Sequence, residues 1–184
     1  MTTIQSKEIE LIDRELEFKT FLNIEKNSPI SVCEVTKQEN VYILKYGKNT
    51  DSWVATHLPN EKRVLERAKE CEGITHLVKD YNSFNGYAAL LKEYAEGNLL
   101  SDSGKGLSTK LQSQLENTIR HLHKSGIVYL DIGSDNIIIS NDRKKATIID
   151  LGLACLKRDE SSYFFEIDKA GDLLDLEELF KLYL

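Results

Sequence analysis

The sequence contains little cysteine and proline, and no long apolar run. Its 184 residues include two prolines and three cysteines, Cys33, Cys71 and Cys155. The cysteines lie far apart, with no C-x-x-C spacing and no neighbouring histidine cluster, which argues against a disulfide framework or a zinc site. No apolar segment reaches the roughly 20 residues that a membrane-spanning helix needs. With 41% apolar residues, the expected class is a globular domain.

Basic charge is also scarce. Lys plus Arg number 24 against 30 Asp plus Glu, so the formal net charge is −6. Proteins that bind nucleic acid or anionic membranes through a broad surface carry excess basic charge, and we therefore expect neither partner. The first 18 residues are charged throughout, unlike a signal peptide. We expect a cytoplasmic protein, or one acting in a host cytosol if it is a secreted effector.

The chain does contain alternating strand-like and helix-like segments. The predicted helices span residues 6–18, 59–68, 108–124 and 169–183. The predicted strands span residues 20–26, 31–37, 41–47, 75–81, 86–94, 127–130, 136–140 and 146–150. Ser108 is the expected N-cap and Gly126 the expected closing glycine of the third helix. Trp53 is interpreted as a packing residue at the edge of the first three strands. This order predicts an α+β fold with two lobes, residues 1–94 and 95–184.

Four polar signals follow one another along these elements. Lys45 ends a predicted strand, and Glu61 lies 16 residues later, near the start of a predicted helix. The loop D-I-G-S-D-N runs from Asp131 to Asn136, and the triplet D-L-G begins at Asp150, 19 residues after Asp131. Alone, each signal has an ordinary explanation as an edge charge, a carboxylate in a first helical turn, or a loop residue. Their joint order needs a common explanation.

In this order the signals resemble the protein-kinase fold, in which a strand lysine, a helix glutamate, a D-x-x-x-x-N catalytic loop and a D-F-G-like triplet follow one another. The hexapeptide K-E-Y-A-E-G at 92–97 resembles the hinge of that family. The resemblance covers residues 20 to 175 and implies a bilobal fold with an antiparallel sheet in the N-lobe and a truncated, mainly helical C-lobe. The ending D-K-A-G-D-L at 168–173 is similar to that of the small kinase of the KEOPS complex. RIO-like kinases and truncated bacterial effector kinases are further resemblances.

The resemblance implies chemistry that uses ATP and Mg²⁺. Lys45, held in place by Glu61, is expected to bind the α- and β-phosphates. Asp131 is expected to orient the acceptor hydroxyl and accept its proton. Asn136 and Asp150 are the expected Mg²⁺ ligands, because a hard cation prefers oxygen donors.

Nucleotide binding would also use two backbone segments. At the hinge, the carbonyl of Glu93 and the N–H of Ala95 are expected to pair with the adenine edge. The glycine-rich phosphate loop of the family is missing, and the chain reads E-K-N-S-P-I-S there. Ser28 and Ser31 are the candidate hydrogen-bond donors in this segment. Without glycine, a close approach of the backbone to phosphate is harder.

Other positions depart from the family pattern. Tyr129 and Leu130 replace the His-Arg pair before the catalytic aspartate, which predicts activity independent of activation-loop phosphorylation. Lys92 precedes the hinge glutamate, where the family has an apolar residue. Either Leu91 takes that position or the back of the pocket is polar. Asp172 is interpreted as structural, bonding from the last helix to the backbone of the catalytic loop.

Three functions remain open on the sequence. The first is a minimal Ser/Thr protein kinase-like phosphotransferase that acts on a protein partner. The second is a pseudokinase or nucleotide-gated binding module within a larger assembly, which the missing glycine loop favours. The third is a small-molecule kinase of the aminoglycoside type, which usually has a larger helical C-lobe. From residue 159 on, the chain has eight acidic residues and two basic ones. This excess of acidic residues indicates a solvated surface or a docking surface for a basic partner.

Overall fold

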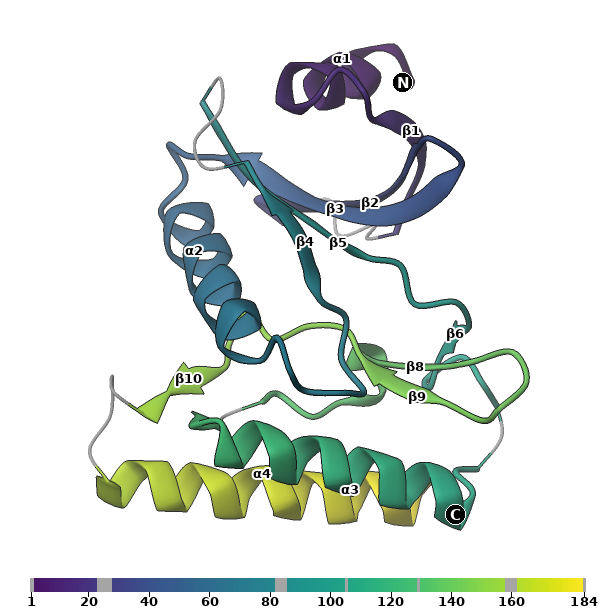
Figure 1. Ribbon diagram of the computed structural model, residues 1–184, viewed down its shortest axis with the longest axis vertical. Coiled ribbons are helices and arrows are strands. Elements are labelled where there is room, and N and C mark those ends of the chain that lie inside the picture. Colours follow the sequence, from purple (N-terminus) through teal and green to yellow (C-terminus); the bar gives the residue numbers. More distant parts are fainter. Residues whose placement is uncertain are drawn as a thin grey trace. The chain divides into compact units, whose positions relative to one another are not determined.

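The computed structural model describes residues 2–22, 28–81, 86–104, 106–128, 130–157 and 162–183. The chain divides into two compact units (Figure 1). Unit 1 comprises Met1–Lys62 and His76–Tyr94, and unit 2 comprises Arg63–Thr75 and Ala95–Leu184. Within the described ranges, no helix combines the length and the apolar composition needed to cross a bilayer.

Unit 1 is built on a five-stranded antiparallel sheet in the order β1-β2-β3-β5-β4. Its strands are β1 (Glu17–Phe21), β2 (Ile30–Lys37), β3 (Asn40–Lys48), β4 (Leu77–Asp80) and β5 (Tyr87–Glu93). Helix α1 (Thr2–Ile12) precedes the sheet, and α2 (Ser52–Arg67) follows β3 and belongs to unit 1 as far as Lys62. The α+β class and the antiparallel sheet that the sequence predicts are confirmed.

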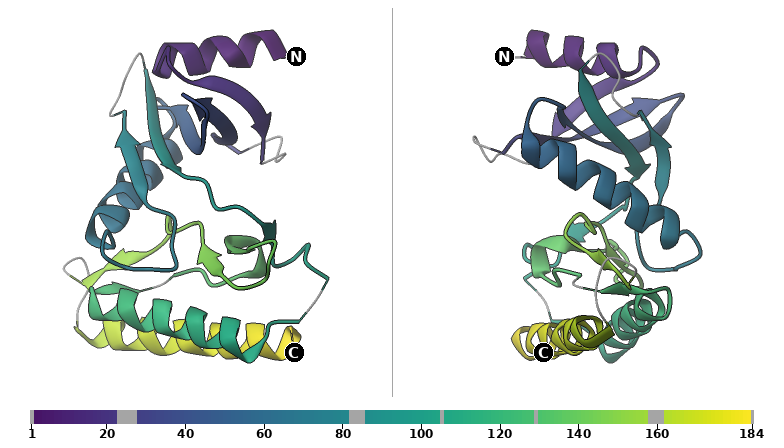
Figure 2. Two further views of the ribbon diagram at one scale, coloured as in Figure 1. Left: turned by 45° about the vertical axis from the view of Figure 1, so that its right-hand side comes forward. Right: turned by 90° about the vertical axis from the view of Figure 1, so that its left-hand side faces the viewer.

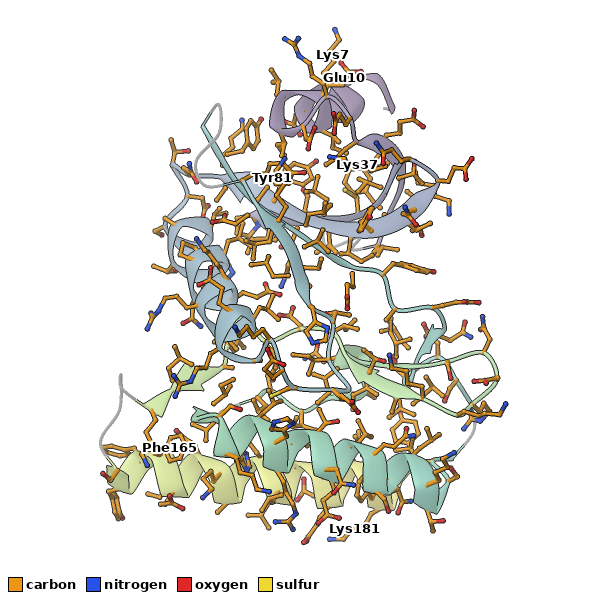
Figure 3. The ribbon with its side chains drawn as sticks, viewed as in Figure 1. Lys7, Glu10, Lys37, Tyr81, Phe165 and Lys181 are labelled. Carbon is orange, nitrogen blue, oxygen red and sulfur yellow. The ribbon has the colours of Figure 1, made fainter. Side chains whose placement is uncertain are left out.

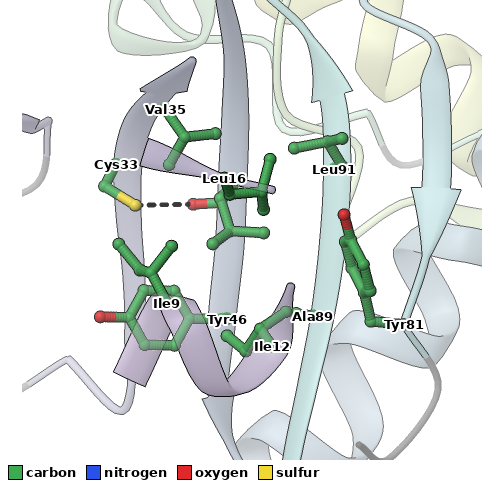
Figure 4. Packing of buried hydrophobic residues seen from close by; sticks show 10 residues of the cluster. Ile9, Ile12, Leu16, Cys33, Val35, Tyr46, Tyr81, Ala89 and Leu91 are labelled. Carbon is green, nitrogen blue, oxygen red and sulfur yellow. Dashed lines mark hydrogen bonds between the residues drawn. The ribbon is translucent and has the colours of Figure 1, made fainter. Parts of the chain in front are cut away.

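Alternation along the strands gives the sheet two apolar faces, because successive side chains of a strand point to opposite sides. Odd-numbered residues of β2 and β5, with even-numbered residues of β3, pack against the side chains of α1 and the turn after it (Figure 4). This cluster contains Ile9, Ile12, Leu16, Cys33, Val35, Leu44, Tyr46, Tyr81, Ala89 and Leu91. On the opposite face, Ile30 and Leu90 pack against Val54 and Leu58 of α2. The sheet is therefore covered by α1 on one face and by α2 on the other.

Helix α2 begins earlier than the sequence predicts. The carboxylate of Asp51 accepts hydrogen bonds from the N–H groups of Trp53 (2.9 Å) and Val54 (3.3 Å), which is the arrangement of an N-cap. The predicted start at Pro59 is wrong, because this proline lies inside the helix. Trp53 consequently lies in the first turn of α2, 50% exposed and stacked on His57, and not in a packed core. Two other predicted helix bounds also shift, since α1 starts at Thr2 and the last helix at residue 162.

Unit 2 contains two long helices and several short strands. The helices are α3 (Thr109–Lys124) and α4 (Ser162–Leu182), which run side by side (Figures 1 and 2). The strands are β6 (Asn98–Leu99), β7 (Ile127–Val128), β8 (Ile137–Ile139), β9 (Ala146–Ile148) and β10 (Cys155–Leu156). Strands β6, β8 and β9 form one sheet, and β7 pairs with β10. Ser108 caps α3 by accepting the N–H of Leu111, and Gly126 follows the helix with φ +77°, as predicted.

Candidate functional site

The charged centre of unit 1 is a buried ion pair between β3 and α2. Lys45 Nζ lies 2.8 Å from Glu61 Oε2. Strand pairing places Lys45 opposite Leu90, so its side chain points to the α2 face of the sheet. Only 1% of the Glu61 side chain and 11% of the Lys45 side chain are exposed. The structure therefore joins the two residues that the sequence analysis pairs.

A second lysine binds the same carboxylate. Lys92 Nζ lies 2.5 Å from Glu61 Oε1, and its side chain is 4% exposed. Lys92 has the parity of Leu90 along β5 and faces α2, whereas Leu91 belongs to the core under α1. Of the two alternatives that the sequence leaves open at this position, the structure selects the polar one. The sequence marks Lys92 as unusual at the position before the hinge glutamate, but no spacing in the sequence indicates its ion pair with Glu61.

The end of β5 is fixed by backbone and side-chain bonds to His76, the residue directly before β4. The N–H of Glu93 donates to the carbonyl of His76 (3.0 Å), and the carboxylate of Glu93 accepts the N–H of His76 (3.2 Å). The Nδ1 atom of His76 lies 2.9 Å from the same carboxylate. Of the two residues whose backbone groups are expected to pair with adenine, Glu93 ends β5 in unit 1 and Ala95 belongs to unit 2.

The two serines predicted to bind phosphate have different hydrogen-bond partners. The hydroxyl of Ser28 donates to the carbonyl of Ile30 (2.9 Å) and accepts its N–H (3.3 Å), which makes a local turn. Ser31 pairs with Tyr46 across β2 and β3 and hydrogen-bonds its phenol group on the α1 face. Strand alternation turns the side chain of Ser31 away from the face that carries Lys45, and a role of this serine in phosphate binding stays a prediction. Residues 23–27 of the predicted phosphate segment lie outside the described residues.

In unit 2, the catalytic-loop sequence holds Asp131 in an unusual backbone conformation. Asp131 has φ +50°, in the left-handed region, and is exposed. The amide of Asn136 donates to the carbonyl of Asp131 (3.0 Å) and to its carboxylate (3.2 Å). The preceding residue, Leu130, is fully buried. Such strained backbone at a polar loop is typical of functional sites, and here it presents a carboxylate to solvent.

Asp172, in α4, holds the backbone at the start of this loop. Its carboxylate accepts the N–H of Leu130 (2.7 Å) and lies 2.8 Å from Nε2 of His123. Asp172 and His123 are both buried. The predicted structural role of Asp172 is confirmed, while its contact with His123 was not foreseen. Two fixed bonds to one buried carboxylate make the position of Leu130, and hence of Asp131, well defined.

The D-L-G triplet lies beside the catalytic loop within unit 2. The N–H of Ile149 donates to the carbonyl of Asn136 (3.0 Å), which ties the two segments together. One oxygen of Asp150 accepts the N–H of Gly152 (2.8 Å), and Leu151 is buried as an apolar anchor. The two expected metal ligands therefore lie on backbone segments that are directly hydrogen-bonded to each other.

Negative charge accumulates around the catalytic loop. Burial, together with the charges of Asp172, Glu178 and Asp131, raises the pKa of Asp175 above its ordinary value. Asp175 was not singled out in the sequence. Asp175 therefore lies in a locally negative part of unit 2, together with Asp172, Glu178 and Asp131.

Comparison with known proteins is consistent with this geometry. The family described as "Protein kinase domain" matches residues 27–169. One solved structure with a similar fold is the Cydia pomonella granulovirus kinase PK-1, with a TM-score of 0.63 and 21% sequence identity. The match covers 84% of this chain but only 59% of that kinase. No curated protein matches. Because the family match extends over most of the chain, including Lys45, Glu61, the loop from Asp131 to Asn136 and the triplet at Asp150, the chain belongs to the protein kinase domain family.

Proposed function

We propose that the chain is a minimal phosphotransferase that uses ATP and Mg²⁺ and transfers the γ-phosphoryl group to a Ser or Thr hydroxyl of a protein partner. The observation that carries the proposal is the exposed Asp131 carboxylate, held by Asn136 and by the Asp172–Leu130 bond. A carboxylate fixed in this way can orient an acceptor hydroxyl and accept its proton.

The donor set of unit 2 fits Mg²⁺. The amide nitrogen of Asn136 is directed to Asp131, so its amide oxygen is the atom available for a cation. Asp150 adds a carboxylate, and Mg²⁺ is commonly bound by one or two such groups together with phosphate oxygens and water. When bound, Mg²⁺ neutralises charge on the phosphates. Asn136 and Asp150 are therefore the proposed ligands.

The residues of unit 1 fit a nucleotide triphosphate. Lys45 supplies a fixed positive charge for the α- and β-phosphates, and Glu61 holds it. The carbonyl of Glu93 and the N–H of Ala95 remain the proposed partners of adenine, and Ser28 the proposed donor at the phosphate segment. Ser31 is not part of the proposal.

The surface of α4 supports a protein acceptor. Tyr163, Phe164, Ile167 and Leu174 form a stripe of apolar side chains that are 47% to 71% exposed. We call this set the α4 stripe. Apart from the buried Asp172, the acidic residues of α4 are Glu166, Asp168, Asp175, Glu177 and Glu178. An apolar stripe on an acidic helix is complementary to a partner segment with apolar and basic side chains.

The first test measures phosphate transfer from γ-labelled ATP with Mg²⁺, to the protein itself and to a lysine- and arginine-rich protein acceptor. We expect wild-type transfer to fall at least about 100-fold in Asp131→Asn and in Asp150→Ala. Asp135→Asn is the matched control, because it removes an exposed carboxylate from the same loop, and we expect it to retain transfer.

The outcomes separate the proposal from its alternative. Nucleotide binding by the wild type without transfer to any acceptor would favour the nucleotide-gated binding module, which the absence of glycine before β2 also favours. Equal transfer by wild type and Asp131→Asn would contradict the assigned role of Asp131. The resemblance to the KEOPS kinase and to effector kinases stays a prediction, for which identification of the partner is the test.

A further inference from the structure

Glu61 is shared between two lysines from neighbouring strands. Its Oε2 atom binds Lys45 at 2.8 Å and its Oε1 atom binds Lys92 at 2.5 Å. The exposed fraction of the side chain is 1% for Glu61, 4% for Lys92 and 11% for Lys45. The carboxylate thus has a deeply buried partner on one oxygen and a more accessible partner on the other.

The strand register explains this arrangement. Lys45 of β3 lies opposite Leu90 of β5, and Lys92 lies opposite Ile43. The two lysines are therefore diagonal neighbours on the α2 face, with Glu61 between them. Both strands are paired on each side, β3 with β2 and β5, and β5 with β3 and β4, so both backbones are held in the sheet. The two lysines differ in exposure: Lys92, at 4%, is the enclosed partner of Glu61, and Lys45, at 11%, is the one whose ammonium group can turn to a ligand.

We propose that Lys92 is a positioning residue that keeps Glu61 paired when Lys45 binds the phosphates of a nucleotide. This inference rests on the proposed function. A buried carboxylate that loses its sole counter-ion is strongly destabilised, because it has neither water nor a cation around it. In this protein Lys45 can redirect its ammonium group while Glu61 keeps the charge-assisted bond to Lys92.

The proposal predicts an effect on nucleotide binding that depends on Glu61. In Lys92→Met, Lys45 is the one of these two lysines that still binds Glu61. Movement of Lys45 to phosphate would then leave the Glu61 carboxylate without either lysine. We expect the Kd for Mg-ATP to rise about tenfold or more. In the double variant Lys92→Met/Glu61→Gln, the buried charge is gone. We expect the Kd to recover at least about threefold relative to Lys92→Met.

Single-variant controls separate positioning from general stability. Lys62 follows Glu61 in α2, and its Nζ lies 2.5 Å from Asp80 of β4. Lys62→Met removes an ion pair between the same helix and sheet without touching Glu61. We expect it to lower the melting temperature while leaving the Kd unchanged. Lys92→Arg keeps the positive charge, and we expect its Kd to stay within about threefold of wild type.

The experiment is calorimetric titration of Mg-ATP into each variant, at a temperature where circular dichroism shows it folded. Transfer assays should show a raised KM for ATP in Lys92→Met, with kcat at saturating ATP within about threefold of wild type. Should Lys92→Met fail to fold, Lys92→Gln takes its place, since glutamine keeps a donor for Glu61 without the charge.

The results distinguish the two levels of the proposal. Equal Kd values for Lys92→Met and Lys62→Met, with tight binding by the wild type, overturn the positioning role and leave the proposed function intact. A Kd that does not improve when Glu61→Gln is added to Lys92→Met overturns it as well. Absence of Mg-ATP binding in the wild type overturns the proposed function first, and the inference with it.

Discussion

Asp172 lies 42 residues along the chain from Leu130, and its carboxylate holds the backbone just ahead of Asp131. The same carboxylate contacts His123 at the end of α3. Neither Leu130 nor His123 is proposed to contact the phosphate or the acceptor hydroxyl. A buried carboxylate with two polar partners acts here by fixing the position of a loop, so its loss should affect stability and catalysis together.

We expect Asp172→Ala to lower the free energy of unfolding by about 3 kcal/mol, because the N–H of Leu130 and the imidazole of His123 both lose a buried partner. The rate of phosphate transfer should fall as well, since Asp131 loses its support. Urea unfolding and transfer assays measure the two effects. Glu116→Ala, which removes an exposed carboxylate of α3, is the control, and similar behaviour of the two variants would argue against the anchoring role.

At the scale of elements, α1 is attached to the sheet of unit 1 by both apolar and polar contacts. Ile9 and Ile12 are buried against the strands. Asp13, directly after the helix, is within 3.6 Å of Lys37 and accepts a hydrogen bond from Tyr81 (2.7 Å), two residues whose positions near α1 are visible in Figure 3. The C-terminal end of α1 is therefore bound to Lys37, the last residue of β2, and to Tyr81, which directly follows β4.

This attachment should depend on pH. Burial raises the pKa of Asp13, but hydrogen bonds from the Glu15 N–H, Tyr81 and Lys79 outweigh it and lower the pKa from 3.8 to about 2. A lowered folded-state pKa stabilises the fold above pH 3.8, and this contribution is lost as the pH falls through about 2. We expect Asp13→Asn to cost about 2 kcal/mol at pH 7 and to flatten the stability profile between pH 4 and 2.

Urea unfolding at a series of pH values measures this dependence. Glu10→Gln is the matched control, because Glu10 is an exposed carboxylate of α1 that Figure 3 shows away from the sheet. An unchanged pH profile in Asp13→Asn would show that the carboxylate does not hold α1.

At the scale of the whole molecule, the charge balance and the α4 stripe point to the same kind of partner. The formal net charge is −6, and eight of the acidic residues follow position 158. We expect Ile167→Asp/Leu174→Asp to raise the KM for a lysine- and arginine-rich protein acceptor about tenfold, because both changes place charge on an apolar contact surface. The Kd for Mg-ATP should not change.

Steady-state transfer assays at two ionic strengths measure this effect. Higher salt should raise the wild-type KM for the basic acceptor, since it screens attraction to the acidic residues of α4. Leu11→Asp, an exposed apolar position on α1, is the control. If it weakens acceptor binding as much as the double variant does, the α4 stripe is not the docking surface.

Much of the candidate site can be predicted from local sequence. The order of Lys45, Glu61, Asp131 and Asp150 indicates the family, and the family match confirms it. The Ser108 cap and the glycine after α3 follow from short-range rules of helix ends. The start of α2 could not be placed in this way, because proline is common in a first helical turn and the Asp51 cap lies further upstream.

The sequence by itself determined the α+β class, the strand and helix periodicities and the residue types that carry the chemistry, because each depends on neighbours within a few positions of the chain. Only the tertiary structure decided that Lys92 binds Glu61, 31 residues away, and that Asp172 binds Leu130 and His123. It also decided that Ser31 faces Tyr46. Such contacts depend on strand register and helix packing, which bring distant side chains to the same buried position, and no local spacing specifies them.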